Sequence, residues 1–312
     1  MTTPTRPLVT IAIPTFNRAD GYLRDALQSA IAQTYPNLEI IVADNCSSDN
    51  TGEVVQAFGD QRVRYIRHDR NIGAINNWNS TLEAARGAYF LMLHDDDLID
   101  ADLVGACMDA AKDSVDLGLI RTGIRIIDGR GATVSQRRNQ VQGDTVADLF
   151  FSWFAGRTSL YIPSTVYNTR RLREIGGFGS KKNLLLDCVA TARLAAYGWT
   201  DVADVKASFR RHQDNMGSAA KVADWADDSL YLLDVITALA PESDAELRRM
   251  GMPFLCRQNY SRAARIENWR ERWAAYSLNY KAFGYTSSPI RFFYRKQVRR
   301  FKNAAKPLQA SR

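Results

Sequence analysis

Three adjacent carboxylates, Asp95, Asp96 and Asp97, directly follow a run of apolar residues, with His94 at the junction. Neighbouring carboxylates repel one another and are costly to bury unpaired, so a positive charge is expected beside them. A hard divalent cation, which prefers oxygen ligands, meets that need. The alternative is a solvated acidic turn that caps the next helix. Residue types alone do not separate these two interpretations, so the position of the carboxylates in the fold has to.

The apolar run before the carboxylates, residues 89–93, predicts a buried strand because both of its faces are hydrophobic. Residues 8–13, 38–43 and 63–66 predict three earlier strands, with helical segments between them. Strands that alternate with helices form a mainly parallel α/β sheet. Ligands bind such a sheet at the carboxyl ends of its strands, which is where the three carboxylates would lie. Their position therefore favours a binding site.

Other polar side chains would reach the same edge of the sheet: Thr15, Asn17 and Arg18 after the first strand, and Asp44 after the second. A carboxylate at the end of the second strand can accept hydrogen bonds from a nucleobase or a ribose hydroxyl, although helix capping is the commoner role. The sequence has neither G-x-G-x-x-G after the first strand nor a Walker A motif. The charge of a nucleotide diphosphate would therefore be met by a metal or by arginines.

The regular alternation weakens beyond residue 110. There we expect strands at 117–127, 160–166 and 202–209, helices at 144–155 and 184–197, and a polar, mobile loop at 128–143. From residue 221 to 280 the pattern is helical, and three tryptophans are expected inside it: Trp225, Trp269 and Trp273. We therefore predict a domain boundary after residue 217 and a helical C-terminal region over 218–312.

The composition is that of a globular protein, with 46% hydrophobic and 24% charged residues among 312. No apolar run approaches the roughly 18 residues of a membrane span, and residues 1–7 lack the apolar core of a signal peptide. The four cysteines are scattered without metal-type spacing, which fits a reducing cytoplasm. No zinc finger or aromatic RNA-binding signature is present, so no nucleic-acid partner is expected.

The formal net charge of +7 is concentrated near the C-terminus. Residues 289–302 predict a helix with an apolar face of Ile290, Phe293, Tyr294, Val298 and Phe301. Six arginines and lysines cover the other face: Arg291, Arg295, Lys296, Arg299, Arg300 and Lys302. This pattern fits a helix that lies on an anionic membrane surface. The alternative is a helix that docks its apolar face on the protein and leaves its charges in water.

Four segments, in this order and spacing, closely resemble the inverting family-2 glycosyltransferases of the GT-A fold: residues 9–18, 41–51, 71–73 and 90–97. The resemblance is strong over residues 8–110 and looser to about residue 217. It implies a Rossmann-like GT-A domain over 1–217. Within it, residues 1–110 would bind a nucleotide sugar, and residues 111–217 would face the acceptor and supply the catalytic base.

The resemblance also implies roles for individual residues. The side chains expected at the donor are Thr15, Asn17, Arg18, Asp44, Asn71, Asn77 (or its neighbour Asn76), Asp95 and Asp97. The acidic cluster stands where the family keeps its D-x-D metal motif, so Asp96 is the expected ligand of Mn²⁺ or Mg²⁺, with His212 completing the site. His94 departs from the family, which usually has an acid there, and it could be a metal ligand or a structural imidazole.

The segment Gly176-Gly177-Phe178, followed by Leu186-Asp187, resembles the family's G-G-F…E-D motif. Leu186 replaces the usual Glu, so the resemblance implies that Asp187 is the catalytic base. The alternative role for Asp187 is helix capping. Basic side chains from nearby loops could close over the phosphates: Arg137, Arg138 or Lys181.

The resemblance implies a metal-dependent transferase that moves a sugar from a UDP-, dTDP- or GDP-linked donor to a saccharide or lipid-linked acceptor with inversion. The expected setting is the assembly of a bacterial surface polysaccharide or lipid-linked oligosaccharide, in the cytoplasm or at the inner face of the plasma membrane. Two alternatives remain at this stage. One is a non-catalytic binding partner with the same fold, and the other is a retaining transferase or a sugar nucleotidyltransferase.

Overall fold

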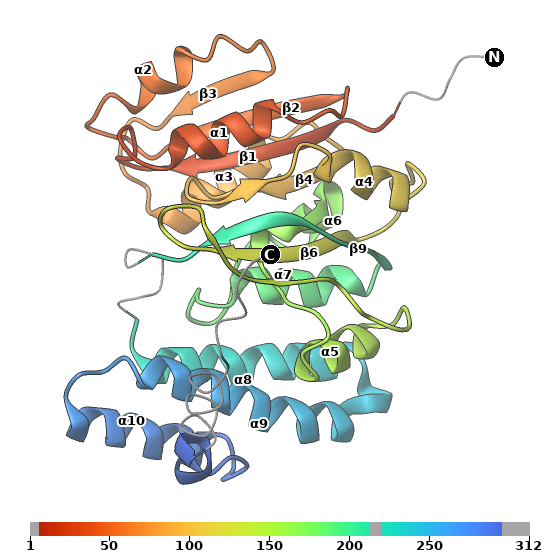
Figure 1. Ribbon diagram of the computed structural model, residues 1–312. Coiled ribbons are helices and arrows are strands. Elements are labelled where there is room, and N and C mark those ends of the chain that lie inside the picture. Colours follow the sequence, from red (N-terminus) through yellow and green to blue (C-terminus); the bar gives the residue numbers. More distant parts are fainter. Residues whose placement is uncertain (1–5, 213–219, 295–312) are drawn as a thin grey trace, which may run out of the picture.

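A computed structural model describes residues 6–212 and 220–294 and contains one nine-stranded mixed sheet with helices on both faces (Figure 1). The strand order is β3-β2-β1-β4-β8-β6-β9-β5, and β7 pairs with β6. The strands are β1 (Val9–Thr15), β2 (Leu38–Asp44), β3 (Val63–Arg67), β4 (Tyr89–Met92), β5 (Leu98–Ile99), β6 (Leu119–Ile127), β7 (Thr133–Arg137), β8 (Thr165–Asn168) and β9 (Trp199–Arg210).

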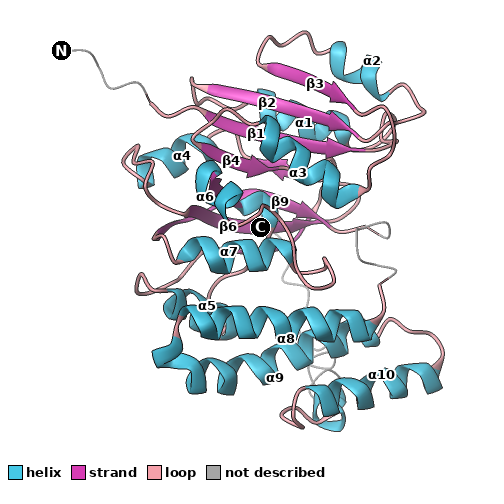
Figure 2. Ribbon diagram, turned by 180° about the vertical axis from the view of Figure 1, so that it is seen from behind, coloured by secondary structure: helices cyan, strands magenta, loops and turns pink. Residues whose placement is uncertain are grey.

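One layer of helices covers each face of the sheet, and a third layer of helices lies beyond one of them. One face of the sheet packs on α1 and α4, and the other packs on α3, α6 and α7. Beyond α7 lies a helical layer of α5, α8, α9 and α10, which Figure 2 shows stacked below the sheet. The helices are α1 (Leu23–Ile31), α2 (Thr51–Gln56), α3 (Ala74–Ala84), α4 (Leu103–Ala110), α5 (Val146–Phe154), α6 (Thr169–Glu174), α7 (Leu186–Ala195), α8 (Val222–Leu239), α9 (Asp244–Ala263) and α10 (Trp269–Ala282).

Six of the nine strands, β1, β2, β3, β4, β6 and β9, point in one direction. The strand β8 lies between β4 and β6 and is antiparallel to both. The carboxyl ends of β1, β2, β4 and β9 therefore meet at one edge of the sheet. The expected α/β fold, with flanking helices and a helical C-terminal region, is confirmed.

The strands have apolar residues on both faces because the core covers both faces of the sheet. In β4, Leu91 packs with the α1 and α4 side, whereas Phe90 and Met92 pack with the opposite side. The cluster that contains Phe90 continues without a break to Leu232 of α8 and Tyr276 of α10. The sheet and the helical layer thus share one core, and the domain boundary after residue 217 stays a prediction.

The segment 128–143, expected to be a mobile loop, contains the strand β7. It forms a hairpin with β6, and the Oδ1 atom of Asp128 accepts hydrogen bonds from the backbone N–H groups of Arg130 (2.9 Å) and Ala132 (3.0 Å) at the turn. All five residues of β7 are exposed. An edge strand that buries neither face has no apolar alternation, so the sequence pattern did not reveal it.

Two further expectations were wrong in detail. The strand predicted at 160–166 begins only at Thr165, because Ile162–Ser164, with Pro163 in its first turn, forms a 3-10 turn. Trp269 and Trp273 are 60% and 44% exposed rather than inside the helical layer.

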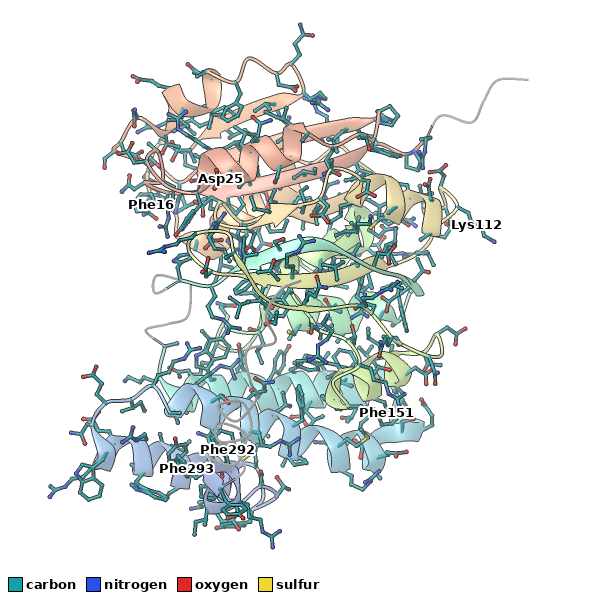
Figure 3. All side chains as sticks on the ribbon, in the orientation of Figure 1. Phe16, Asp25, Lys112, Phe151, Phe292 and Phe293 are labelled. Atoms are coloured by element: carbon teal, nitrogen blue, oxygen red, sulfur yellow. The ribbon has the colours of Figure 1, made fainter. Side chains whose placement is uncertain are left out.

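The C-terminal helix is described only as far as residue 294, so residues 295–302 of the predicted basic helix lie outside the described residues. Phe292 packs on Tyr260 (5.3 Å between ring centroids) and Phe293 packs on Tyr276 (4.9 Å). Figure 3 labels the two phenylalanines, which lie in the helical layer. Ile290 and Tyr294 are 71% and 72% exposed. Of the predicted apolar face, Phe293 docks on α10, whereas Ile290 and Tyr294 are exposed. Phe292, which was not part of that face, also docks. Within residues 6–212 and 220–294, no helix has the length and apolar character needed to cross a membrane.

Candidate functional site

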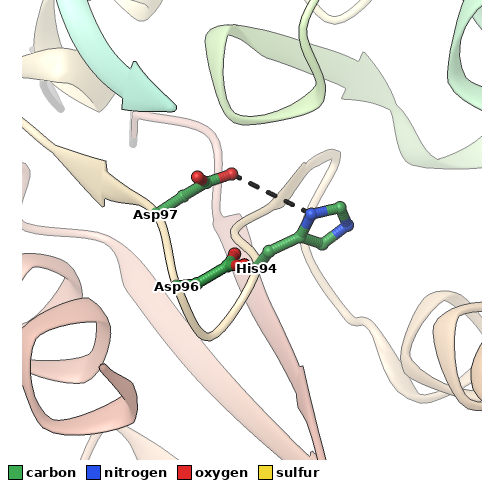
Figure 4. A group of neighbouring side chains, drawn as sticks. All are labelled: His94, Asp96 and Asp97. Atoms are coloured by element: carbon green, nitrogen blue, oxygen red, sulfur yellow. Dashed lines mark ion pairs between the residues drawn. The ribbon is translucent and has the colours of Figure 1, made fainter. Parts of the chain in front are cut away.

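The acidic loop after β4 meets the end of β9. The Nε2 atom of His212 lies 2.7 Å from Oδ2 of Asp96, although 116 positions separate them in the sequence. The two side chains are only 10% and 13% exposed. The ligand atoms of His94, Asp96 and Asp97 all lie within 4.8 Å of one another (Figure 4). The structure thus places His212 against Asp96, and Asp96 in turn forms a compact group with His94 and Asp97 at this edge of the sheet.

The buried carboxylate of Asp97 tests whether these residues fit a cation. Its Oδ1 atom accepts a hydrogen bond from the backbone N–H of Arg210 (2.8 Å), but its Oδ2 atom has no hydrogen-bond partner in the described chain. An unsatisfied buried carboxylate oxygen is costly, and a bound cation would satisfy it. Burial and the charge of Asp96 raise the pKa of Asp97 well above its usual range. The carboxylate therefore fits a position beside a positive charge.

The ring of His94 lies against Trp78, with 4.5 Å between centroids, and its Nδ1 atom is 3.9 Å from Oδ2 of Asp97. Burial lowers the pKa of His94, which favours the neutral imidazole, the form that binds metals. A mixed set of carboxylates and imidazoles suits Mn²⁺ and related divalent ions. The residues present fit such an ion. His94 packs its ring on Trp78 and lies close enough to Asp97 to be a further metal ligand.

Arg210, the last residue of β9, frames the acidic loop from the other side. Its Nε atom donates to the backbone oxygen of Asp96 (2.8 Å), and a terminal nitrogen lies 3.3 Å from the carboxylate of Asp25. Its guanidinium lies 4.2 Å from the ring centroid of Tyr22, which in turn is 5.4 Å from the ring of His212. The sequence offered no sign of Tyr22 and Asp25 as neighbours of this site.

Asp95 couples the acidic loop to β1. Its Oδ2 atom accepts a hydrogen bond from the hydroxyl of Thr15 (2.7 Å). Burial raises the pKa of Asp95 to about 6, and the charge of Asp96 adds to the rise, whereas Thr15 and the charge of Arg18 oppose it. Arg18 is half-buried beside these acids. The predicted residues Thr15 and Asp95 therefore lie together.

The loops after β1 and β2 are joined side by side, as expected for neighbouring parallel strands. The N–H of Asn17 donates to Oγ of Ser47 (2.8 Å), and the Oδ1 atom of Asn17 accepts from the N–H of Ser48 (2.8 Å). Asn17 has φ 53°, a left-handed conformation that asparagine tolerates well. Phe16, 42% exposed, stands at this edge in Figure 3. The loops form a shared, partly open rim.

Asp44 lies beneath this rim and is 1% exposed. Its Oδ1 atom accepts from the N–H of Ser47 (2.8 Å), and its Oδ2 atom accepts from the hydroxyl of Tyr65 and lies 3.7 Å from Nε of Arg67. A carboxylate retains further lone pairs for a ligand. In this structure Asp44 holds the loop, and its contact with a nucleotide stays a prediction.

The two predicted asparagines differ in their surroundings. Asn71 is exposed, and its Oδ1 atom accepts from Nδ2 of Asn45 (2.9 Å), so it stands at the rim. Asn77 is 2% exposed; its Nδ2 atom donates to the backbone oxygen of Ala43 and its Oδ1 atom meets His68, both at 3.0 Å. Asn77 therefore supports the end of β2 from inside, and its expected contact with the donor has no support in this geometry.

Asp187 occupies the first turn of α7. The helix packs on β6 and β8, antiparallel to β6, and a short turn joins its end to β9. Its N-terminus therefore lies at the same edge as the end of β9 (Figure 1). Burial raises the pKa of Asp187, while the backbone N–H groups of Cys188 and of Asp187 itself partly oppose the rise. A carboxylate with a raised pKa is a stronger proton acceptor. The side chain is therefore suited to serve as a general base.

The basic side chains expected to close over the phosphates include Arg138 and Lys181. Arg138 pairs with Asp204 (2.6 Å). Lys181 lines a pocket of about 400 Å³ together with Arg193 and Tyr231, between the glycine-rich loop and the helices α7 and α8. Closure of these side chains over a diphosphate stays a prediction.

Several known proteins resemble this chain. TuaG, a putative teichuronic acid biosynthesis glycosyltransferase of Bacillus subtilis, is 35% identical over 94 residues, which are 30% of this chain and 37% of TuaG. The structure of S. aureus TarS 1–349 in complex with UDP-GlcNAc superimposes with a TM-score of 0.62 at 17% identity, over 88% of this chain and 80% of that one. The mannosyltransferase PcManGT from Pyrobaculum calidifontis, solved with GDP-Man and Mn²⁺, gives a TM-score of 0.53 at 17% identity, over 91% and 84%.

These similarities differ in what they cover. The two structural likenesses extend over most of the chain and establish the fold. The curated relatives match in part, because the chain spans 37% of the length of TuaG and 27% of the succinoglycan biosynthesis protein ExoO of Rhizobium meliloti. The family model of glycosyl transferase family 2 matches residues 10–177, which include the acidic loop and both donor-side loops. The chain belongs to glycosyl transferase family 2.

Proposed function

We propose that this protein is a metal-dependent inverting glycosyltransferase that uses a nucleotide-diphosphate sugar. One observation carries the proposal: Asp96 and His212 meet at 2.7 Å, beside a buried Asp97 oxygen that has no hydrogen-bond partner among the described residues. A nucleotide-sugar transferase must offset the charge of a diphosphate leaving group, and a glycine-rich phosphate loop is absent from the sequence. A cation site at the carboxyl edge of the sheet supplies that need.

Asp96 and His212 would hold Mn²⁺ or Mg²⁺, with His94 and Asp97 at its side. When bound, the ion offsets the negative charge that develops on the departing diphosphate. Arg18 adds a fixed positive charge near Asp95, and the rim residues Asn17 and Asn71 offer hydrogen bonds to the nucleoside. These side chains bind and orient the donor.

The acceptor side is proposed to work through Asp187. Its carboxylate takes the proton from the acceptor hydroxyl while that oxygen attacks the anomeric carbon. The attack comes from the face opposite to the diphosphate, so a single displacement inverts the anomeric configuration. The raised pKa of Asp187 makes it a better acceptor of this proton.

The donor classes follow from chemistry and likeness together. TarS was solved with UDP-GlcNAc and PcManGT with GDP-Man, which supports a UDP-, dTDP- or GDP-linked sugar as donor. TuaG and ExoO carry names from teichuronic acid and succinoglycan biosynthesis. We propose a saccharide or lipid-linked acceptor in the assembly of a bacterial surface polysaccharide.

We also propose that the protein acts in the cytoplasm, at the inner face of the plasma membrane, through residues 289–302. The exposed Ile290 and Tyr294 and the basic sequence that follows them support this surface. Replacing Arg295, Lys296, Arg299 and Arg300 by Gln should abolish sedimentation with anionic vesicles and leave the protein folded. Unchanged sedimentation would leave the helix with a docking role only.

The enzymatic proposal is tested with purified protein and a panel of nucleotide sugars, with Mn²⁺ or with a chelator. We expect one donor to raise the melting temperature in the presence of the ion and to be consumed by transfer or hydrolysis. The anomeric configuration of the product, measured by NMR, should be opposite to that of the donor. Retention would indicate a retaining transferase, a requirement for a nucleoside triphosphate would indicate a nucleotidyltransferase, and no turnover with any donor would favour a binding partner.

A further inference from the structure

The helix α8 of the helical layer contains a buried carboxylate that the donor and metal sites do not use. Asp228 is 0% exposed. Its two oxygens accept four hydrogen bonds, all from one loop: the hydroxyl of Ser180 (2.6 Å) and the N–H groups of Lys182 (2.6 Å), Leu184 (2.7 Å) and Leu185 (3.0 Å). A single side chain thus holds the backbone at Lys182, Leu184 and Leu185 and the side chain of Ser180.

Hydrogen bonds to a buried carboxylate are stronger than most hydrogen bonds in proteins. Burying a carboxylate is costly unless hydrogen bonds replace its water, and bonds to an ionised acceptor are about twice as strong as neutral ones. The helix α7 begins at Leu186, and Leu185, at its N-cap position, makes no capping bond with its own side chain. Asp228 accepts from the N–H groups of Leu185, the N-cap residue, and of Leu184 before it, so it fixes the chain from another helix at the point where α7 begins.

The other end of the same loop is held from the donor half. The N–H of Phe178 donates to Oδ1 of Asn79 on α3 (2.8 Å), and Nδ2 of Asn79 donates back to the oxygen of Phe178 (3.0 Å). A Cβ atom on Gly177 would lie 2.4 Å from that Oδ1 atom, so only glycine fits there. The segment 178–185 is anchored at both ends by side chains of distant helices.

The anchored segment leads directly to Asp187, two residues after Leu185. The direction of the Asp187 carboxylate depends on where α7 begins and how firmly its first turn is held. We propose that Asp228 is a positioning residue, which keeps the first turn of α7 in place so that Asp187 meets the acceptor hydroxyl. This inference rests on the proposed role of Asp187 as the base.

The test replaces Asp228 by Asn, which keeps the size of the side chain but replaces one acceptor oxygen by an NH₂ group facing N–H donors. A misplacement of about 1 Å can cost on the order of 100-fold in rate. We expect kcat of Asp228→Asn to fall by about 10- to 100-fold, with an unchanged Kd for the donor nucleotide in Mn²⁺. Amide hydrogen exchange at Lys182, Leu184 and Leu185 should become faster.

The matched control is Asp224→Asn, one turn earlier on α8. Asp224 faces Lys182 at 3.5 Å, and both side chains are more than a third exposed, 37% and 40%. The control removes the same charge from the same helix without touching the backbone of the loop. It should keep the kcat and the amide protection of the wild type.

A wild-type kcat in Asp228→Asn would overturn the proposal, and so would a loss of donor affinity equal to the loss of kcat, because that pattern indicates general unfolding. If Asp228→Asn does not fold, Ser180→Ala is the test, because it removes one of the four hydrogen bonds to Asp228. An unchanged kcat together with faster amide exchange in the loop would refute the positioning role of Asp228. Activity that survives in Asp187→Asn is a separate failure, because it refutes the base and leaves the measured anchoring intact.

Discussion

The loops of the proposed donor half (residues 1–110) and the loop before α7 in the proposed acceptor half (residues 111–217) are held in opposite ways. The donor loops after β1 and β2 bond to each other, through Asn17 and the backbone of Ser48 and through Asp44 and the backbone of Ser47. The loop before Asp187 has few partners of its own and is held by Asn79 and Asp228, which lie 99 and 44 positions away from Phe178 and Leu184. One half supports itself, whereas the other depends on remote helices.

The reason lies in the sheet. Adjacent parallel strands bring their following loops to the same edge, so short polar side chains can join them directly. The loop before α7 has no such neighbour, and the helical layer supplies its anchors. The proposed cation site would belong to both halves, because Asp96 follows β4 and His212 follows β9. We expect substitutions in the two halves to separate donor binding from transfer.

The largest difference between the effect on transfer and the effect on donor binding is expected from Asp187→Asn. Removing the general base should lower kcat by about 10²- to 10⁴-fold, whereas the Kd for donor and Mn²⁺, measured by calorimetry, should stay within twofold because the donor loops do not depend on α7. A weakened donor Kd would show that the two halves are not independent. Full transfer activity would remove Asp187 from the mechanism.

A substitution at the proposed cation site, to which both halves contribute, should affect donor binding as well as transfer. In Asp96→Asn we expect weaker Mn²⁺ binding by electron paramagnetic resonance and a loss of kcat of about 10²- to 10³-fold. Asp116→Asn, which removes an exposed acid from the same domain, is the control and should behave as the wild type. Metal-dependent turnover that survives in Asp96→Asn would contradict the assignment of the cation site.

The pH dependence sharpens the comparison on the acceptor side. Because burial raises the pKa of Asp187, its basic form should be lost at a higher pH than for an ordinary carboxylate. The rate of transfer should fall about tenfold per pH unit below that pKa. Binding of the donor nucleotide in Mn²⁺ should not follow the same curve, and a shared curve would point to the acids of the cation site instead.

The same shift has a consequence for stability, with a definite sign. A carboxyl group whose pKa is raised by folding stabilises the protein at low pH, and this stabilisation is lost as the pH rises through the raised pKa. Asp187→Asn carries no charge to bury, so above that pKa it should melt at or above the temperature of the wild type. The difference between their melting temperatures should vanish in acid. A variant that melts lower at every pH would mean that Asp187 is mainly a structural cap.

The smallest effects are expected from a pair of glycines, one in each half. A Cβ atom on Gly118 would lie 1.9 Å from the backbone oxygen of Leu194, so Gly118→Ala must push β6 and α7 apart and should destabilise the protein by about 1–3 kcal/mol. Gly105 lies in α4 with nothing near its Cβ position, so Gly105→Ala should stabilise by about 1 kcal/mol. Thermal denaturation measures both, and only Gly118→Ala should also lower kcat, since it disturbs the helix of Asp187.

The sequence by itself determined the strands of the first half and the side chains at their ends. A buried parallel strand is apolar on both faces, so residues 8–13, 38–43 and 89–93 were predictable from local pattern, and so was the meeting of Thr15 with Asp95 at one edge. Segment order and spacing also indicated the family. These properties depend on neighbouring residues or on the regular geometry of a parallel sheet.

Only the tertiary structure decided the rest. It gave Asn77 an internal role, placed Tyr22 and Asp25 around Arg210, and showed that β7 is an exposed edge strand. It also brought Asp228 to the loop before Asp187. The strand β7 was missed because it buries neither face, although it pairs with its neighbour in the sequence. The other contacts have no local signature, because each joins elements that are distant in the sequence and are adjacent only in the folded chain.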